Sequence, residues 1–78
     1  MDREAILEKV ISLVSETLDV DAETLTAETE FKALGADSFD LLELVTAFED
    51  EFEESLEDDD LEEIKTIGDA VDAIEKAR

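Results

Sequence analysis

The chain is 78 residues long and carries 26 acidic against 6 basic side chains, a formal net charge of −20 at pH 7. This length suits a single domain, residues 1–78, and leaves no room for a deep enzyme cleft. The charge repels nucleic acid and anionic membranes, so we expect protein partners with basic patches, no nucleic-acid binding and no membrane insertion. Hydrophobic residues still make up 44% of the chain, which predicts a packed core instead of a disordered acidic tail.

Cysteine and histidine are both absent from the chain. Without cysteine there is neither a disulfide nor a protein thiol, and without histidine a serine lacks its usual general base, so we expect no enzymatic activity. The opening residues, MDREAILEKV, contain acids and no apolar run, which argues against a signal peptide. No stretch approaches the ~20 apolar residues of a membrane span. The sequence predicts a monomeric, soluble, cytoplasmic protein.

The first predicted element is an amphipathic helix over residues 2–18. Its apolar stripe recurs at three and four residues and comprises Ile6, Leu7, Val10, Ile11, Leu13, Val14 and Leu18. A long connection follows over residues 20–34. Its apolar residues Leu25, Phe31 and Leu34 predict that it packs against the helices.

A second helix is predicted from Asp37 to about Glu53. Its expected inner face comprises Phe39, Leu42, Val45, Phe48 and Phe52, widened by Leu41 and Leu44. A short helical segment over residues 57–64 precedes a last helix that Thr66 and Asp69 cap and that ends near Ala77, with Gly68 tolerable in its first turn. The pattern predicts an all-α fold, a small four-helix bundle of three longer helices and one short helix with a long first loop.

The stretch that opens the second helix has a distinctive composition. Gly35 permits a tight turn, Asp37 is placed to cap the helix, and Asp40 is placed to reach back to its entrance. Ser38 is then the first residue inside the helix. We expect its hydroxyl to point outward, where a modifying enzyme could reach it.

At these residues the chain resembles the acyl carrier proteins. That family shows a Leu-Gly-x-Asp-Ser-x-Asp run at the start of its second helix, and the serine carries a 4'-phosphopantetheine arm. The run here reads LGADSFD, followed by LLELVTAFEDEF and SLEDDDLEEIKTIGDAVDAI, so the resemblance covers nearly the whole chain. It implies that coenzyme A supplies a covalent 4'-phosphopantetheine on Ser38, where acyl chains are held as thioesters and presented to the enzymes of fatty acid synthesis.

The resemblance also implies roles for other residues. Asp37 would help to bind the divalent metal used during arm transfer, although no resident metal site is expected. The phosphopantetheinyl transferase and acyl-handling enzymes would dock through basic patches onto Asp37, Asp40, Glu43, Thr46, Ala47, Glu49, Asp50, Glu62 and Glu63. An acyl chain would enter a cleft lined by Leu41, Val45, Phe48, Leu56, Leu61 and Ile64.

Alternatives remain open at this point. Phe39 replaces the family's usual leucine after the serine and Thr46 a common methionine, which leaves a polyketide or other secondary pathway as a second choice. A non-carrier class is an acidic helical interaction or divalent-cation-binding module. Residues 19–30 imitate an EF-hand loop, but Thr24 occupies the position that requires glycine.

Overall fold

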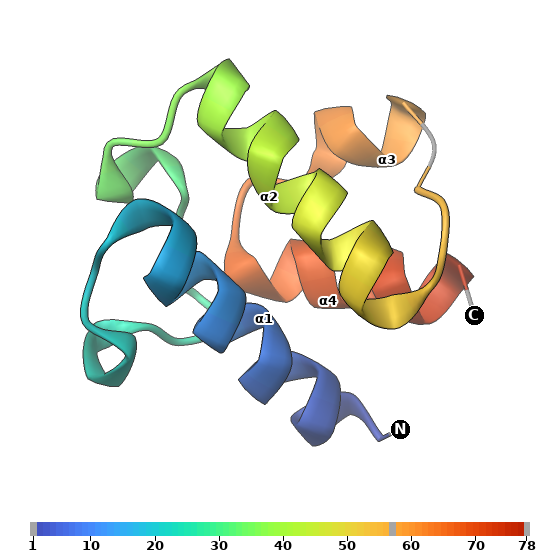
Figure 1. Cartoon of the computed structure of the whole chain (residues 1–78), viewed down its shortest axis with the longest axis horizontal. Helices are drawn as coiled ribbons and strands as arrows, with labels where there is room; N and C mark the ends of the chain where they lie inside the picture. The colour runs from blue at the N-terminus through green and yellow to red at the C-terminus, as the bar shows by residue number, and fades with distance from the viewer. Residues whose placement is uncertain (1, 57, 78) are drawn as a thin grey trace.

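The computed structural model describes residues 2–56 and 58–77. The α-helices are α1 (Arg3–Leu18), α2 (Ser38–Phe52), α3 (Asp58–Glu63) and α4 (Ile67–Ala77), and the long first connection holds two 3₁₀ turns, η1 (Ala22–Thr24) and η2 (Lys32–Leu34). This connection wraps one end of the bundle, while both chain termini lie toward the other end (Figure 1). The predicted all-α bundle of three longer helices, one short helix and a long first loop is confirmed.

The core forms where α1 packs against both α2 and α4. Each of these helices supplies an apolar stripe. Leu25 and Phe31, the apolar residues of the long connection that were predicted to pack against the helices, are buried with them. Leu34 is half-buried against the same cluster. The largest fully buried side chains are Phe48, Ile6, Leu44, Ile67, Ile74, Val10, Val14 and Val71.

Short polar side chains set the helix boundaries in a chain that lacks proline. Asp2 caps α1 by accepting a hydrogen bond from the amide of Ala5, so α1 starts at Arg3. The capping box predicted for α4 is present: Asp69 N donates to Thr66 Oγ1 and Thr66 N donates to Asp69 Oδ2, both at 3.1 Å. The carboxyl ends of α1 and α2 fall at Asp19 and Glu53, both left-handed at φ 55°, although glycine is the usual residue there.

The first connection is hydrogen-bonded to the entrance of α4. Glu30 and Thr66 form an isolated antiparallel bridge, and Phe31 N donates to Lys65 O at 3.0 Å. Gly68 N donates to Ala27 O at 2.7 Å, and a Cβ on Gly68 would lie 2.9 Å from that oxygen. Gly68 is therefore not only tolerable in the first turn of α4, as predicted, but favoured there, because an added Cβ would crowd the Ala27 oxygen.

Two residues of α2 that were predicted to face the core are exposed instead. Phe39 and Leu42 are 68% and 56% exposed, whereas Leu44, Val45 and Phe48 are buried. Apolar residues surround more than half of this helix, so two stripes compete. The stripe containing Leu44 and Phe48 is the one buried in the core, where α2 packs against α1. The short helix begins at Asp58 and ends at Glu63; Glu57, predicted to start it, lies outside the described residues.

Within the described ranges, no helix combines the length and the apolar character that crossing a bilayer requires.

Candidate functional site

The loop before α2 delivers Ser38 to the surface. After η2, Gly35 adopts a left-handed conformation at φ 81°, and its amide donates to Lys32 O at 3.1 Å. Ala36 N also bonds back, to Phe31 O at 3.2 Å. The chain therefore reverses tightly and enters α2 through the extended residue Asp37. The glycine turn predicted from the sequence is confirmed.

A reciprocal capping box fixes the entrance of α2. Asp40 N donates to Asp37 Oδ1 at 2.9 Å, and Asp37 N donates to Asp40 Oδ2 at 3.3 Å. Ser38 is the first residue of the 15-residue helix and is exposed. The amides of the first helical turn have no backbone carbonyl one turn earlier to bond, so they add positive potential beside the Ser38 hydroxyl. This geometry presents the hydroxyl to a large modifying protein and favours a phosphate on it.

An apolar groove runs from Ser38 between α2 and α3. It has a volume of about 410 Å³ and is lined by Ser38, Leu41, Leu42, Val45, Leu61 and Glu62. A second hollow of about 610 Å³ shares Ser38 and Leu41 and extends toward Ile64 and the first connection. The attachment serine predicted from the sequence thus stands between two hollows.

The predicted cleft residues divide into three groups. Leu41, Val45 and Leu61 line the groove beside Ser38, and Ile64 lines the second hollow. Phe48 is fully buried in the core, and Leu56 is half-buried against it. Leu42, which was not expected in the groove, lines it instead. Since Leu42 lies one turn after Ser38 on the helix, the spacing of these two residues is the signal that could have found it.

Most of the predicted docking residues of α2 lie along one stripe, whereas the carboxylate of Glu49 is engaged elsewhere. Asp40, Glu43, Ala47 and Asp50 recur at three and four residues and therefore share a face of the helix. Thr46 is exposed, and its hydroxyl donates to Leu42 O at 3.0 Å. Glu49 is half-buried and its Oε2 accepts from Leu56 N at 2.8 Å, so this carboxylate holds the segment after α2. Glu62 and Glu63 are exposed on α3.

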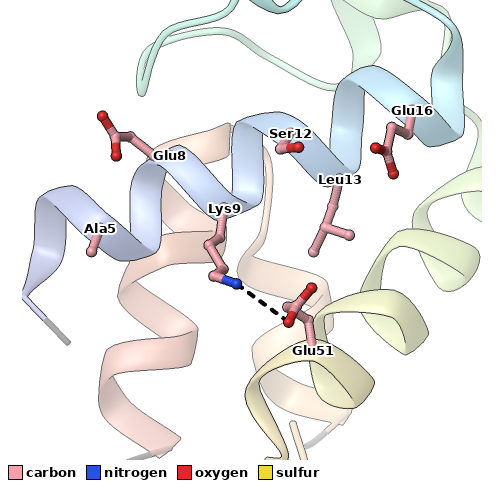
Figure 2. A pocket seen from close by; sticks show the side chains of 7 residues that line it. All are labelled: Ala5, Glu8, Lys9, Ser12, Leu13, Glu16 and Glu51. Carbon is pink, nitrogen blue, oxygen red and sulfur yellow. Dashed lines mark hydrogen bonds and ion pairs between the residues drawn. The ribbon is translucent and has the colours of Figure 1, made fainter.

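Another hollow lies away from Ser38, between α1 and the end of α2. It has a volume of about 420 Å³, and Figure 2 shows Lys9 reaching across it toward Glu51, with their Nζ and Oε2 atoms 3.5 Å apart. Its other lining residues are Ala5, Glu8, Ser12, Leu13 and Glu16, all on α1. None of the predicted site residues takes part in it.

The segment that imitates an EF-hand loop folds differently from one. Asp19 ends α1, and Asp21 caps η1 by accepting from Glu23 N at 3.0 Å. Among the residues that the structure describes, no three carboxylates converge as a set of metal ligands.

Comparison with known proteins gives a consistent result. The family model described as "Phosphopantetheine attachment site" matches residues 8–74. The acyl carrier protein of Porphyromonas gingivalis is 54% identical over 69 residues, covering 87% of this chain and 88% of that protein. The acyl carrier protein of Thermotoga maritima is 51% identical over 75 residues, covering 95% of this chain and 93% of that protein.

Two solved structures are also similar over most of their length. The acyl carrier protein from Enterococcus faecalis superposes with a TM-score of 0.82 at 39% identity, covering 100% of both chains. The crystal structure of an acyl carrier protein from Thermotoga maritima superposes with a TM-score of 0.84 at 38% identity, covering 99% of this chain and 91% of that one.

Proposed function

We propose, given that this chain belongs to the acyl carrier protein family, that Ser38 is the residue that bears its phosphopantetheine arm. The protein carries acyl chains on covalently bound 4'-phosphopantetheine. The observation that supports Ser38 as the attachment point is its place as the exposed first residue of α2, beside an apolar groove. We place this activity in fatty acid synthesis, the typical role of the family. A cytoplasmic location stays a prediction.

The arm is attached to Ser38 by transfer of the phosphopantetheine group from coenzyme A. Ser38 Oγ bonds to the phosphorus of coenzyme A that carries pantetheine, and the bond to the bridging oxygen breaks, so that adenosine 3',5'-bisphosphate leaves. The hydroxyl proton passes to a base of the transferase, because this chain has no histidine to accept it. The bound arm supplies the thiol that a chain without cysteine lacks. The protein itself catalyses no step; it positions the hydroxyl.

The wild-type protein provides the direct test of attachment. Incubation with coenzyme A, magnesium and a broad-specificity phosphopantetheinyl transferase should add about 340 Da, the mass of one arm. Fragmentation of the product should place that mass within residues 33–47. A gain located in any other segment contradicts Ser38 as the attachment site.

Docking of the transferase and acyl-handling enzymes is assigned to the stripe of α2 that follows Ser38. Asp40, Glu43 and Asp50 carry negative charge along one side of the helix; Glu43 and Asp50 are exposed, and Asp40 is half-buried. These acids belong to a chain with a net charge of −20. Such a surface accelerates encounter with basic partners more than it strengthens the final complex. Glu49 is a weaker candidate, because its carboxylate already accepts the amide of Leu56.

Reversing charge on this stripe should slow arm transfer. In Glu43→Lys/Asp50→Lys we expect kcat/KM for loading to fall about tenfold at low salt, with a flatter salt dependence. The matched control is Glu8→Lys/Glu16→Lys, which changes net charge equally on exposed positions of α1. Steady-state loading rates at several salt concentrations provide the measurement. Equal losses in both variants would assign the effect to net charge alone and remove the stripe from docking.

The groove between α2 and α3 is proposed to receive the first carbons of the acyl chain. Its wall is formed by Leu41, Leu42, Val45 and Leu61, and it opens beside Ser38. Phe48 and Leu56 belong to the core behind this wall.

Acylation should therefore be visible at the groove. Between holo protein and octanoyl-holo protein, we expect the largest methyl chemical-shift changes at Leu41, Val45 and Leu61, because an apolar chain buries surface against apolar walls. Methyl groups of Val10 and Val14 in α1 serve as internal controls. Carbon–proton correlation spectra provide the measurement. Shifts no larger at the groove than in α1 would show that the chain stays outside.

A further inference from the structure

Positive charge is scarce in this chain, yet two lysines line the hollow beside Ser38. Lys32 lies in η2 and Lys65 lies between α3 and α4, and both are exposed. The hydrogen bond from Phe31 N to Lys65 O, at 3.0 Å, joins their two segments, and the bridge between Glu30 and Thr66 reinforces it. The fold therefore brings together two cations that are far apart in the sequence.

The hollow is balanced in charge, in contrast to the chain as a whole. Its charged lining residues are Lys32, Lys65, Glu30 and Asp37, two of each sign, whereas the chain carries 26 acids and 6 bases. Asp37 is also engaged as the cap of α2, since its Oδ1 accepts from Asp40 N. Relative to the rest of the surface, this is a place where an added anion meets little repulsion.

The two lysines are also uncommitted, unlike other cations of the chain. Arg3 bonds to Asp72 and Glu75, and these hydrogen bonds raise its pKa, while Lys9 pairs with Glu51. No carboxylate among the described residues lies within ion-pair distance of Lys32 or Lys65. Their ammonium groups are therefore available for a ligand.

We infer that Lys32 and Lys65 bind the phosphate of the arm, an inference that rests on the proposed attachment at Ser38. The phosphodiester carries a negative charge and would otherwise face the carboxylates of Asp37, Asp40 and Glu62. Lysine ammonium groups form charge-assisted hydrogen bonds to phosphate oxygens, and the amides at the start of α2 add to this attraction. If Lys32 and Lys65 hold the phosphate, the part of the arm nearest Ser38 would lie along the second hollow. The apolar groove would then stay free for the acyl chain.

Competitive acetylation of the lysines tests this inference. With limiting acetic anhydride at about 0.05 M salt, we expect Lys32 and Lys65 to react two- to fivefold more slowly in holo than in apo protein. Lys9 in the same sample is the internal reference, and its rate should not change. At about 1 M salt the protection should largely disappear, because the screening length falls to about 3 Å. Peptide mass spectrometry gives each rate. Protection that persists at high salt would indicate steric shielding by the arm and overturn the inference.

A variant pair provides a second measurement. In Lys32→Gln/Lys65→Gln, conversion from apo to holo should lower the melting temperature by about 2–4 °C at low salt, because the phosphate loses its cations. The wild type and the matched Lys9→Gln/Lys76→Gln protein should show a change at least twofold smaller. Equal changes in all three proteins would overturn the inference. Failure of Ser38 to gain the arm at all is a different outcome, which would refute the attachment itself.

Discussion

Ser38→Ala is expected to abolish the gain of about 340 Da that the wild-type chain shows with coenzyme A, magnesium and a transferase. The variant removes the only atom that we propose forms the bond to phosphorus, so the loss should be complete and not partial. The fold should be unaffected, because Ser38 is exposed at the start of α2 and alanine is favourable in helices. We expect the free energy of unfolding to change by less than about 0.5 kcal/mol. Intact mass spectrometry and thermal unfolding give the two readouts.

Controls separate the hydroxyl from its surroundings. Ser12→Ala and Ser55→Ala alter other exposed serines and should leave the mass gain intact. Asp37→Asn retains an acceptor for the amide of Asp40, so the cap survives. If Asp37 also helps to hold the metal during transfer, this variant should load more slowly at limiting magnesium. A Ser38→Ala protein that still gains the arm would refute the proposed site.

Gly68→Ala is expected to lower the free energy of unfolding by about 2–3 kcal/mol. The added Cβ would lie 2.9 Å from the backbone oxygen of Ala27, and that oxygen already accepts the Gly68 amide at 2.7 Å. A backbone atom cannot rotate away, so the contact between the first connection and α4 has to shift. For a chain of 78 residues, whose total stability is about 4–12 kcal/mol, this is a large share. Urea unfolding followed by circular dichroism measures it.

Gly35→Ala is the matched control, because at this other glycine a side chain is disfavoured by the backbone conformation and not by a steric contact. Nothing lies within 4 Å of a Cβ on Gly35, but its φ of 81° disfavours residues with a side chain. We expect a loss of about 1–2 kcal/mol from conformation alone. Gly35→Asn should lose less than Gly35→Ala, since asparagine tolerates the left-handed region. If Gly68→Ala lost no more than about 0.5 kcal/mol, the close approach to Ala27 would not be a stability determinant.

The sequence was most informative where local chemistry decides the structure. Helical spacing predicted α1, and the residue pairs Asp37 and Asp40, and Thr66 and Asp69, predicted the two capping boxes. Gly35 predicted the turn that precedes Ser38. In each case the interaction spans a few residues, so the pattern and its consequence lie within one short window. The family resemblance, carried by the same window, also proved correct.

Features that depend on tertiary contact could not be predicted in the same way. Phe39 and Leu42 fit an apolar stripe as well as Leu44 does, and only packing in the core against α1 decides which stripe is buried. Glu49 was predicted as a docking residue, but its carboxylate accepts the amide of Leu56, seven residues along the chain. Lys32 and Lys65 line the same hollow only because the backbones of two distant segments are hydrogen-bonded to each other.

The hydrogen bonds between the first connection and the entrance of α4 also bear on how this end of the molecule moves. Ala27, Thr29 and Lys65 supply the backbone oxygens that receive the amides of Gly68, Ile67 and Phe31. Because these bonds are shared between segments distant in sequence, neither side can fray alone. The segments that support Ser38, the proposed attachment site, should then belong to the part of the protein whose amides exchange most slowly and only on global unfolding. When a partner enzyme takes up the acyl chain, this end of the protein would stay rigid, and the motion would take place in the phosphopantetheine arm.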